Sequence, residues 1–159
     1  MAVQARLDQA NIPFILEGKP FVAMGQTLLT IGARTVPLYT HTIMCQIAST
    51  RKWAPWLQAN LGGTTGTQYP LGIYMGDDLT AAQIAAADVL NLPILVGGSG
   101  VVIDEGQLVF DLGNTGVGAL GTLAVIPTVP TNLALTARSI LQLLGIFPKS
   151  VIAISAAEN

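Results

Sequence analysis

The stretch that decides the fold is residues 69–110, YPLGIYMGDDLTAAQIAAADVLNLPILVGGSGVVIDEGQLVF. It contains short apolar runs at 71–75, 89–96, 101–103 and 108–110, each closed by glycine or by acidic residues. Apolar runs rich in β-branched or aromatic residues and bounded by turn residues are typical of buried strands. We therefore expect a β-rich core, with turns at 97–100 and 104–106 and with Pro93 at a sheet edge or a bulge.

Outward from this core, the sequence predicts a hairpin over 35–59, with Pro55 at an edge or bulge, and a flexible loop over 61–68. Residues 80–87 favour a single helical turn, and 111–130 a loop with irregular strand. The one clear helix is expected at 131–144, ending at Gly145, with a last strand at 150–154. Its apolar stripe is formed by Leu133, Ala137, Ile140, Leu141 and Leu144.

The composition is unusual in charge. Only 10% of the 159 residues are charged, whereas about 25% is ordinary, and 51% are apolar. A soluble domain normally keeps itself dispersed with surface charge. We therefore expect much of the exterior to lie in permanent contacts with other subunits; the alternative is a monomer with a neutral polar surface.

Several classes of protein are disfavoured. No apolar run approaches the roughly 18 residues of a membrane span, and the first residues lack the apolar stretch of a signal peptide. The single cysteine, Cys45, indicates folding in the cytosol without an internal disulfide. Residues 1–60 are net basic and 61–159 net acidic, but the basic residues are scattered, so we expect no direct contact with nucleic acid.

Candidate catalytic and binding motifs are weak. G-x-G-x-x-G occurs at 116–121, but prolines follow where a dinucleotide site needs a helix. His41 and Cys45 allow a nucleophilic pair, although packing roles are expected. The acidic pairs at 77–78 and 104–105 could bind a cation, but pairs beside glycine are first of all turn residues. Trp53 and Trp56 could stack on a ligand, but we expect them in the core or a subunit contact. We expect no enzyme activity, catalytic residue, cofactor or metal.

Residues 1–33 predict an extended amino-terminal arm, with short strands at 13–16 and 21–24, while 34–159 form a single domain. The arm has too few contiguous apolar residues to fold alone, and such segments are commonly ordered by a partner or by strand addition. We expect it to contact a partner protein or a neighbouring protomer. The candidate contact residues are Arg6, Ile12, Phe14, Ile15, Lys19, Phe21 and Val22.

Taken together, a series of segments in order resembles the head decoration (capsid cement) proteins of tailed bacteriophages. They are FVAMGQTL at 21–28, KWAP at 52–55, PLGIY at 70–74, DDLTAA at 77–82, ADV at 87–89, PILVGG at 93–98, DEGQLV at 104–109, LGIF at 144–147 and EN at 158–159. None is a catalytic motif. The stretch DLGNTGVGALGTLAVIP at 111–127 departs from the resemblance, because it is richer in glycine and less polar.

The resemblance implies a mainly β domain with one C-terminal helix (α+β), similar to a small β-tulip or barrel, with the extended arm attached. It also implies a structural virion protein, made in the host cytoplasm and bound as a homotrimer to the outer surface of an icosahedral head. There it would hold neighbouring major capsid proteins together against the pressure of packed DNA. The alternatives are a tail-tube or head–tail connector subunit and a small-molecule-binding β-barrel.

Overall fold

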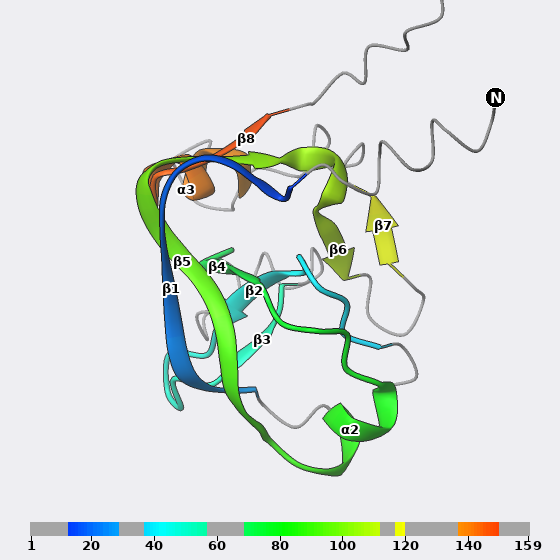
Figure 1. Ribbon diagram of the computed structural model, residues 1–159. Helices are drawn as coiled ribbons and strands as arrows, with labels where there is room; N and C mark the ends of the chain where they lie inside the picture. Colours follow the sequence, from blue (N-terminus) through cyan, green and yellow to red (C-terminus); the bar gives the residue numbers. More distant parts are fainter. Residues whose placement is uncertain (1–12, 29–36, 57–68, 112–116, 120–136, 150–159) are drawn as a thin grey trace, which may run out of the picture.

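The computed structural model of the protein describes residues 13–28, 37–56, 69–111, 117–119 and 137–149. Within these ranges the fold is mainly β, with one larger sheet, one two-stranded sheet and short helices (Figure 1). The loop expected at 61–68 and the strand expected at 150–154 lie outside the described residues.

The larger sheet has six strands in the order β1-β3-β2-β4-β5-β8. Their bounds are Ile15–Leu28 (β1), Ile43–Gln46 (β2), Trp53–Pro55 (β3), Gly72–Tyr74 (β4), Val89–Asp104 (β5) and Ile146–Lys149 (β8). β1 also pairs with β5, so the five strands β1, β3, β2, β4 and β5 form a closed ring. Within this ring, β1 pairs with β3 at a single position, Leu28↔Trp53. β6 (Val109–Asp111) and β7 (Val117–Ala119) form the second sheet.

β5 is the strand that connects the others. Along one edge it pairs antiparallel with β1, from Ile15↔Ile103 to Leu28↔Val89, and the two strands form the long curved ribbon of Figure 1. Its other edge pairs first with β4, at Ile73↔Leu95, and then with β8, at Val101↔Ile146. Pro93 lies where the β1–β5 register shifts, as expected for a strand residue without a backbone donor.

The turn expected at 97–100 is absent, and that prediction is wrong: β5 runs through these residues without a break. Both of its edges are occupied there. Ser99 and Gly98 pair with Lys19 and Pro20 of β1, and on the other side Gly98 N donates to Leu144 O at 3.1 Å. Two paired edges hold the backbone extended, and the glycines allow it to bend sharply within the strand.

The neighbouring backbones approach so closely here that side chains would not fit. A Cβ on Gly18 would lie 2.3 Å from Gly100 O, and one on Gly145 would lie 2.2 Å from Gly98 O. Gly18 and Gly145 also have φ values of 94° and 80°, which L-residues with side chains rarely adopt. We call this contact of β1, β5 and the turn before β8 the glycine crossing.

Apolar side chains fill both faces of the sheet. Neighbouring residues of one strand point to opposite faces, so Ile73 and Leu95 enter one cluster while Tyr74 and Ile94 enter the other. The α3-side cluster contains Phe14, Ile43, Cys45, Trp56, Ile73, Leu95, Val101, Ile103, Leu108, Phe110, Leu141 and Ile146. The α2-side cluster contains Leu38, Met44, Trp53, Tyr74, Ile84, Leu92 and Ile94.

Two short α-helices cover these clusters, where the sequence predicted one clear helix. α2 (Ala81–Ala86) develops from the helical turn expected after Thr80, whose hydroxyl accepts from Gln83 N while the Gln83 side chain accepts from Thr80 N. This reciprocal capping fixes a helix that is too short to be stable alone. α3 (Ala137–Leu143) is the described part of the expected 131–144 helix, and Gly145 follows it as predicted.

Strand β1 includes most of the described part of the segment expected to be an arm. Residues 15–16 of the first predicted short strand and all of the second, 21–24, belong to one strand of 14 residues. Its pairing with β5 places residues 15–28 in the same sheet as the following elements. Residues 1–12 and 29–33 of the predicted arm lie outside the described residues.

The glycine crossing leads to a first prediction. Gly18→Ala and Gly100→Ala both place alanine at positive φ, at a cost of roughly 1–2 kcal/mol each. Only Gly18→Ala adds a clash, because a Cβ at Gly100 meets nothing within 4 Å. Urea unfolding should therefore show that Gly18→Ala lowers the free energy of unfolding by at least about 1 kcal/mol more than Gly100→Ala. Equal losses would mean that the strands are not in contact at Gly18.

Helix α3 leads to a second prediction. Leu141 is fully buried in the α3-side cluster, whereas Leu143, two residues later, is 75% exposed. Leu141→Ala should lower the free energy of unfolding by about 2–5 kcal/mol, through lost burial and the cavity left behind. Leu143→Ala is the matched control and should change it by less than about 0.5 kcal/mol. Similar effects of the two changes would show that the helix is rotated about its axis.

Candidate functional site

The predicted contact residues separate into two groups. Phe14 is buried in the α3-side cluster, and Ile15 and Val22 pack against it, so these three side chains serve the chain's own core. Lys19 and Phe21 are exposed. The pairing of β1 with β5 explains the separation, because it directs part of β1 toward the core and leaves the rest outside. Arg6 and Ile12 lie outside the described residues.

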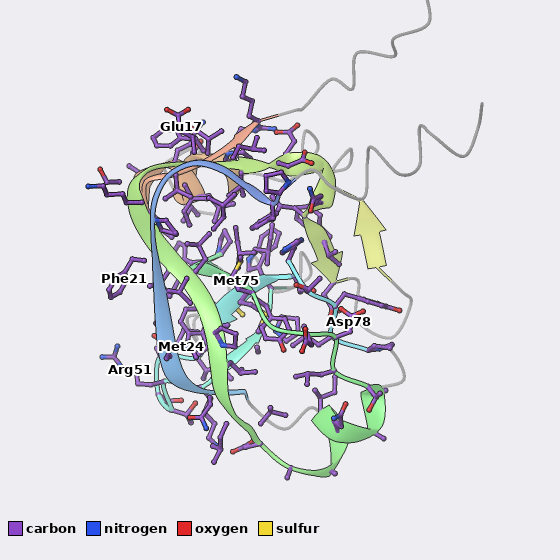
Figure 2. All side chains as sticks on the ribbon, viewed as in Figure 1. Glu17, Phe21, Met24, Arg51, Met75 and Asp78 are labelled. Carbon is purple, nitrogen blue, oxygen red and sulfur yellow. The ribbon has the colours of Figure 1, made fainter. Side chains whose placement is uncertain are left out.

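Three large apolar side chains are exposed on the β1–β5 ribbon. They are Phe21 and Met24 of β1 and Leu90 of β5, with exposed fractions of 65%, 64% and 65%. Figure 2 shows Phe21 projecting away from the outer side of β1. Of these three residues, only Phe21 was a predicted contact residue. Met24 and Leu90 were not, because apolar residues within an apolar run are expected to be buried. We call these three residues the ribbon patch.

A second feature is a pocket of about 440 Å³ beside the segment that precedes β2. It is lined by Tyr39, Thr40, His41, Asp78, Gln107 and Val109, and we call it the His41 pocket. Its residues come from three separate parts of the chain. Of these residues, the sequence had singled out His41 as part of a possible nucleophilic pair and Asp78 as part of an acidic pair that could bind a cation, although a turn was the preferred interpretation.

The backbone around His41 is held at several points. Thr40 N donates to Asp78 Oδ1 at 2.7 Å, His41 N donates to Tyr74 O at 2.7 Å, and Val109 N donates to His41 O at 3.1 Å. These bonds fix His41 at a φ of 63°, in the left-handed region that non-glycine residues seldom occupy. A residue kept there by its surroundings is a common feature of functional sites.

The His41 ring stacks on Phe14, with ring centroids 3.7 Å apart and 12° between the planes. Burial lowers the pKa of His41 below its usual 6.5, although a hydrogen bond with the Gln107 backbone and the charges of Asp104 and Asp78 oppose this shift. The ring is therefore neutral at pH 7. A neutral imidazole presents one donor and one acceptor nitrogen.

Cys45 has no part in this pocket. It is fully buried in β2, and its Sγ donates to Ala54 O at 3.4 Å. Burial raises the pKa of its thiol to about 12, so the thiolate required of a nucleophile is not formed at neutral pH. His41 precedes β2 at positive φ, so the two residues are not on one regular strand as the sequence had allowed.

The other candidate motifs have structural roles. Asp104 caps the 3₁₀ helix η2 (Glu105–Gln107) by accepting from Gly106 N, and Trp53 and Trp56 are buried in the two clusters. Residues 117–119 of the G-x-G-x-x-G sequence form β7, where a dinucleotide site requires the start of a helix. Over the described ranges, no group of three His, Cys, Asp or Glu side chains is placed to hold a metal ion.

Comparisons of this chain with protein-family models, with curated proteins and with solved structures found no match. In the part of the chain that the structure describes, no helix has the length and apolar character needed to cross a membrane.

The environment of His41 leads to a third prediction. At pH values between the lowered pKa of folded His41 and the usual value of 6.5, which applies to the unfolded chain, the unfolded chain binds a proton that the folded chain does not. This contribution to stability is therefore present above pH 6.5 and is lost as the pH falls toward the folded pKa. Because His41 is the only histidine, an NMR titration reports on it without ambiguity. A folded pKa equal to that of the denatured chain would contradict the burial of the ring.

Proposed function

We propose that the protein is a head decoration protein of a tailed bacteriophage, which binds the outer surface of the capsid as a trimer and cements neighbouring coat subunits. The single observation that carries this proposal from the structure is the ribbon patch. In the β1–β5 register Phe21 pairs with Gly97 and Leu90 with Thr27, so the exposed side chains are spread along the ribbon. Single exposed apolar residues are normal on protein surfaces, but three along one ribbon, beside a β1 edge that pairs only at Leu28 among the described residues, support an extended contact. The chain-wide resemblance in sequence supplies the kind of partner.

The backbone of β1 supports the same surface. One edge of β1 is paired with β5 along its length, and among the described residues its other edge pairs only at Leu28. An unpaired edge accepts an added strand from another chain through main-chain hydrogen bonds. Residues 21–28 of this edge, FVAMGQTL, contain neither charge nor proline, the two features that commonly prevent such pairing.

The charge distribution also fits a structural partner. Two of the described charge pairs, Lys52–Asp88 and Arg138–Glu105, are internal to the chain. With only 10% charged residues, the protein has little charge left for electrostatic steering. Repeated weak contacts on a symmetric shell add up through multivalency. In this proposal the function follows from buried area and geometry, without a chemical reaction.

A fourth prediction tests the proposal. The purified protein should co-sediment with expanded, undecorated heads built from the coat protein of the phage that encodes it. Light scattering should give about three times the mass of one chain, in solution or after release from heads. The double change Phe21→Ser/Met24→Ser should weaken head binding by at least about tenfold, because it removes two exposed apolar contacts.

Leu143→Ser is the matched control, since Leu143 is equally accessible but lies on α3, away from the ribbon patch. It should leave head binding unchanged, and all variants should show the thermal unfolding of the original protein. Absence of the original protein from sedimented heads would overturn the proposed function. Equal loss of binding in the double variant and in Leu143→Ser would show that the ribbon patch is not the contact.

A further inference from the structure

Asp78, which lines the His41 pocket, and Phe21 of the ribbon patch lie on opposite sides of the view in Figure 2. A partner bound at Phe21 therefore leaves Asp78 accessible. The pocket is an open depression of about 440 Å³, and the backbone of its rim is held by hydrogen bonds.

The backbone of the rim is held at several points. The bridge between Leu38 and Leu79, with backbone bonds of 2.9 and 2.8 Å, fixes the segment before Tyr39 to the segment after Asp78. Thr42 fixes the other end, since its hydroxyl donates to Tyr39 O at 2.7 Å and its backbone forms a bridge to Val109. The backbone segments that carry the lining side chains are thus held in place, which lowers the cost of ordering when a ligand binds.

The chemistry of the lining restricts the ligand. Among the lining residues the only formal charge is that of Asp78, and no lysine or arginine takes part, which disfavours anions. Asp78 is exposed, so a single ion pair between it and a cation contributes little. The remaining polar side chains are neutral: a phenol, a hydroxyl, an imidazole and an amide, which can both donate and accept hydrogen bonds.

These properties fit a ligand that carries adjacent hydroxyl groups on an otherwise apolar ring. Its hydroxyls can donate to the carboxylate of Asp78 and to the acceptor nitrogen of neutral His41, since the ring N–H of His41 is bonded to the Gln107 backbone. Its C–H groups can pack on Tyr39 and Val109, which give the pocket its aromatic and aliphatic surface. We propose that the His41 pocket binds a neutral saccharide, one pyranose residue of a glycan.

The test uses the full-length protein and four probes, the methyl glycosides of glucose, galactose, mannose and N-acetylglucosamine. Each is titrated into ¹⁵N-labelled protein and followed by amide NMR shifts. We expect at least one glycoside to produce saturable shifts at Thr40, His41 and Val109, with a dissociation constant in the millimolar range. Residues of the ribbon patch should not shift. Absence of saturable shifts with all four probes would overturn the proposal.

Asp78→Asn is the decisive variant, because it removes the charge while an amide oxygen still accepts from Thr40 N. It should raise the dissociation constant of the binding glycoside about threefold, because a hydrogen bond to an exposed carboxylate is weakened by solvent. Asp77→Asn is the matched control, since this neighbouring exposed carboxylate does not line the pocket. Equal effects of the two variants would contradict the assigned role of Asp78.

A second variant tests whether a loss of binding comes from the pocket or from a change in the fold. Tyr39→Leu removes the aromatic ring but keeps apolar bulk, and it should also weaken glycoside binding while thermal unfolding stays unchanged. Methylammonium is the competing probe. If it shifts the same amides and the glycosides do not, the pocket is a cation site and the saccharide proposal is wrong. None of these outcomes depends on head binding, so the proposed function is tested separately.

Discussion

The close backbone contact at the glycine crossing is the constraint on which the rest of the fold depends. β5 pairs with β1 on one edge and with both β4 and β8 on the other, so one chain segment defines the positions of three other strands. The turn before β8 reaches it through two backbone bonds, Gly98 N to Leu144 O and Val101 N to Gly145 O. These bonds require backbones too close for a Cβ at Gly145. Glycine at this point is therefore a packing requirement as well as a conformational one.

The same crossing explains how much of the fold the sequence predicted. Local patterns identified the apolar runs that became β4, β6 and the two ends of β5, the capped turn at Thr80 and the glycine after α3. They failed at Gly97–Gly98, where local rules favour a turn. What keeps the strand continuous is pairing with Lys19 and Pro20 on one side and with the turn at Leu144 on the other. Partners so distant in sequence leave no local signal.

The candidate sites show the same division between local and distant information. Phe21 was identified because an apolar residue in a sparse, extended segment requires a partner. Phe14 was assigned to the same surface, but it stacks on His41, which the chain supplies from its own next segment. The His41 pocket was missed for a related reason. It is assembled from three segments, and its key backbone feature, the positive φ of His41, depends on bonds to Tyr74 and Val109 that no spacing rule reveals.

The low charge of the chain and its fold are connected. Of the charged residues that the structure describes, Lys52, Asp88, Glu105 and Arg138 form internal pairs, Asp104 caps η2, and Asp111 is buried. The charged groups that fix the fold are thus largely unavailable for steering a partner from a distance. Six other described charged residues are exposed, namely Glu17, Lys19, Arg51, Asp77, Asp78 and Lys149, but they are of mixed sign. In the proposed capsid role, recognition would therefore depend mainly on apolar contact and backbone pairing, which gain strength when many copies bind one surface.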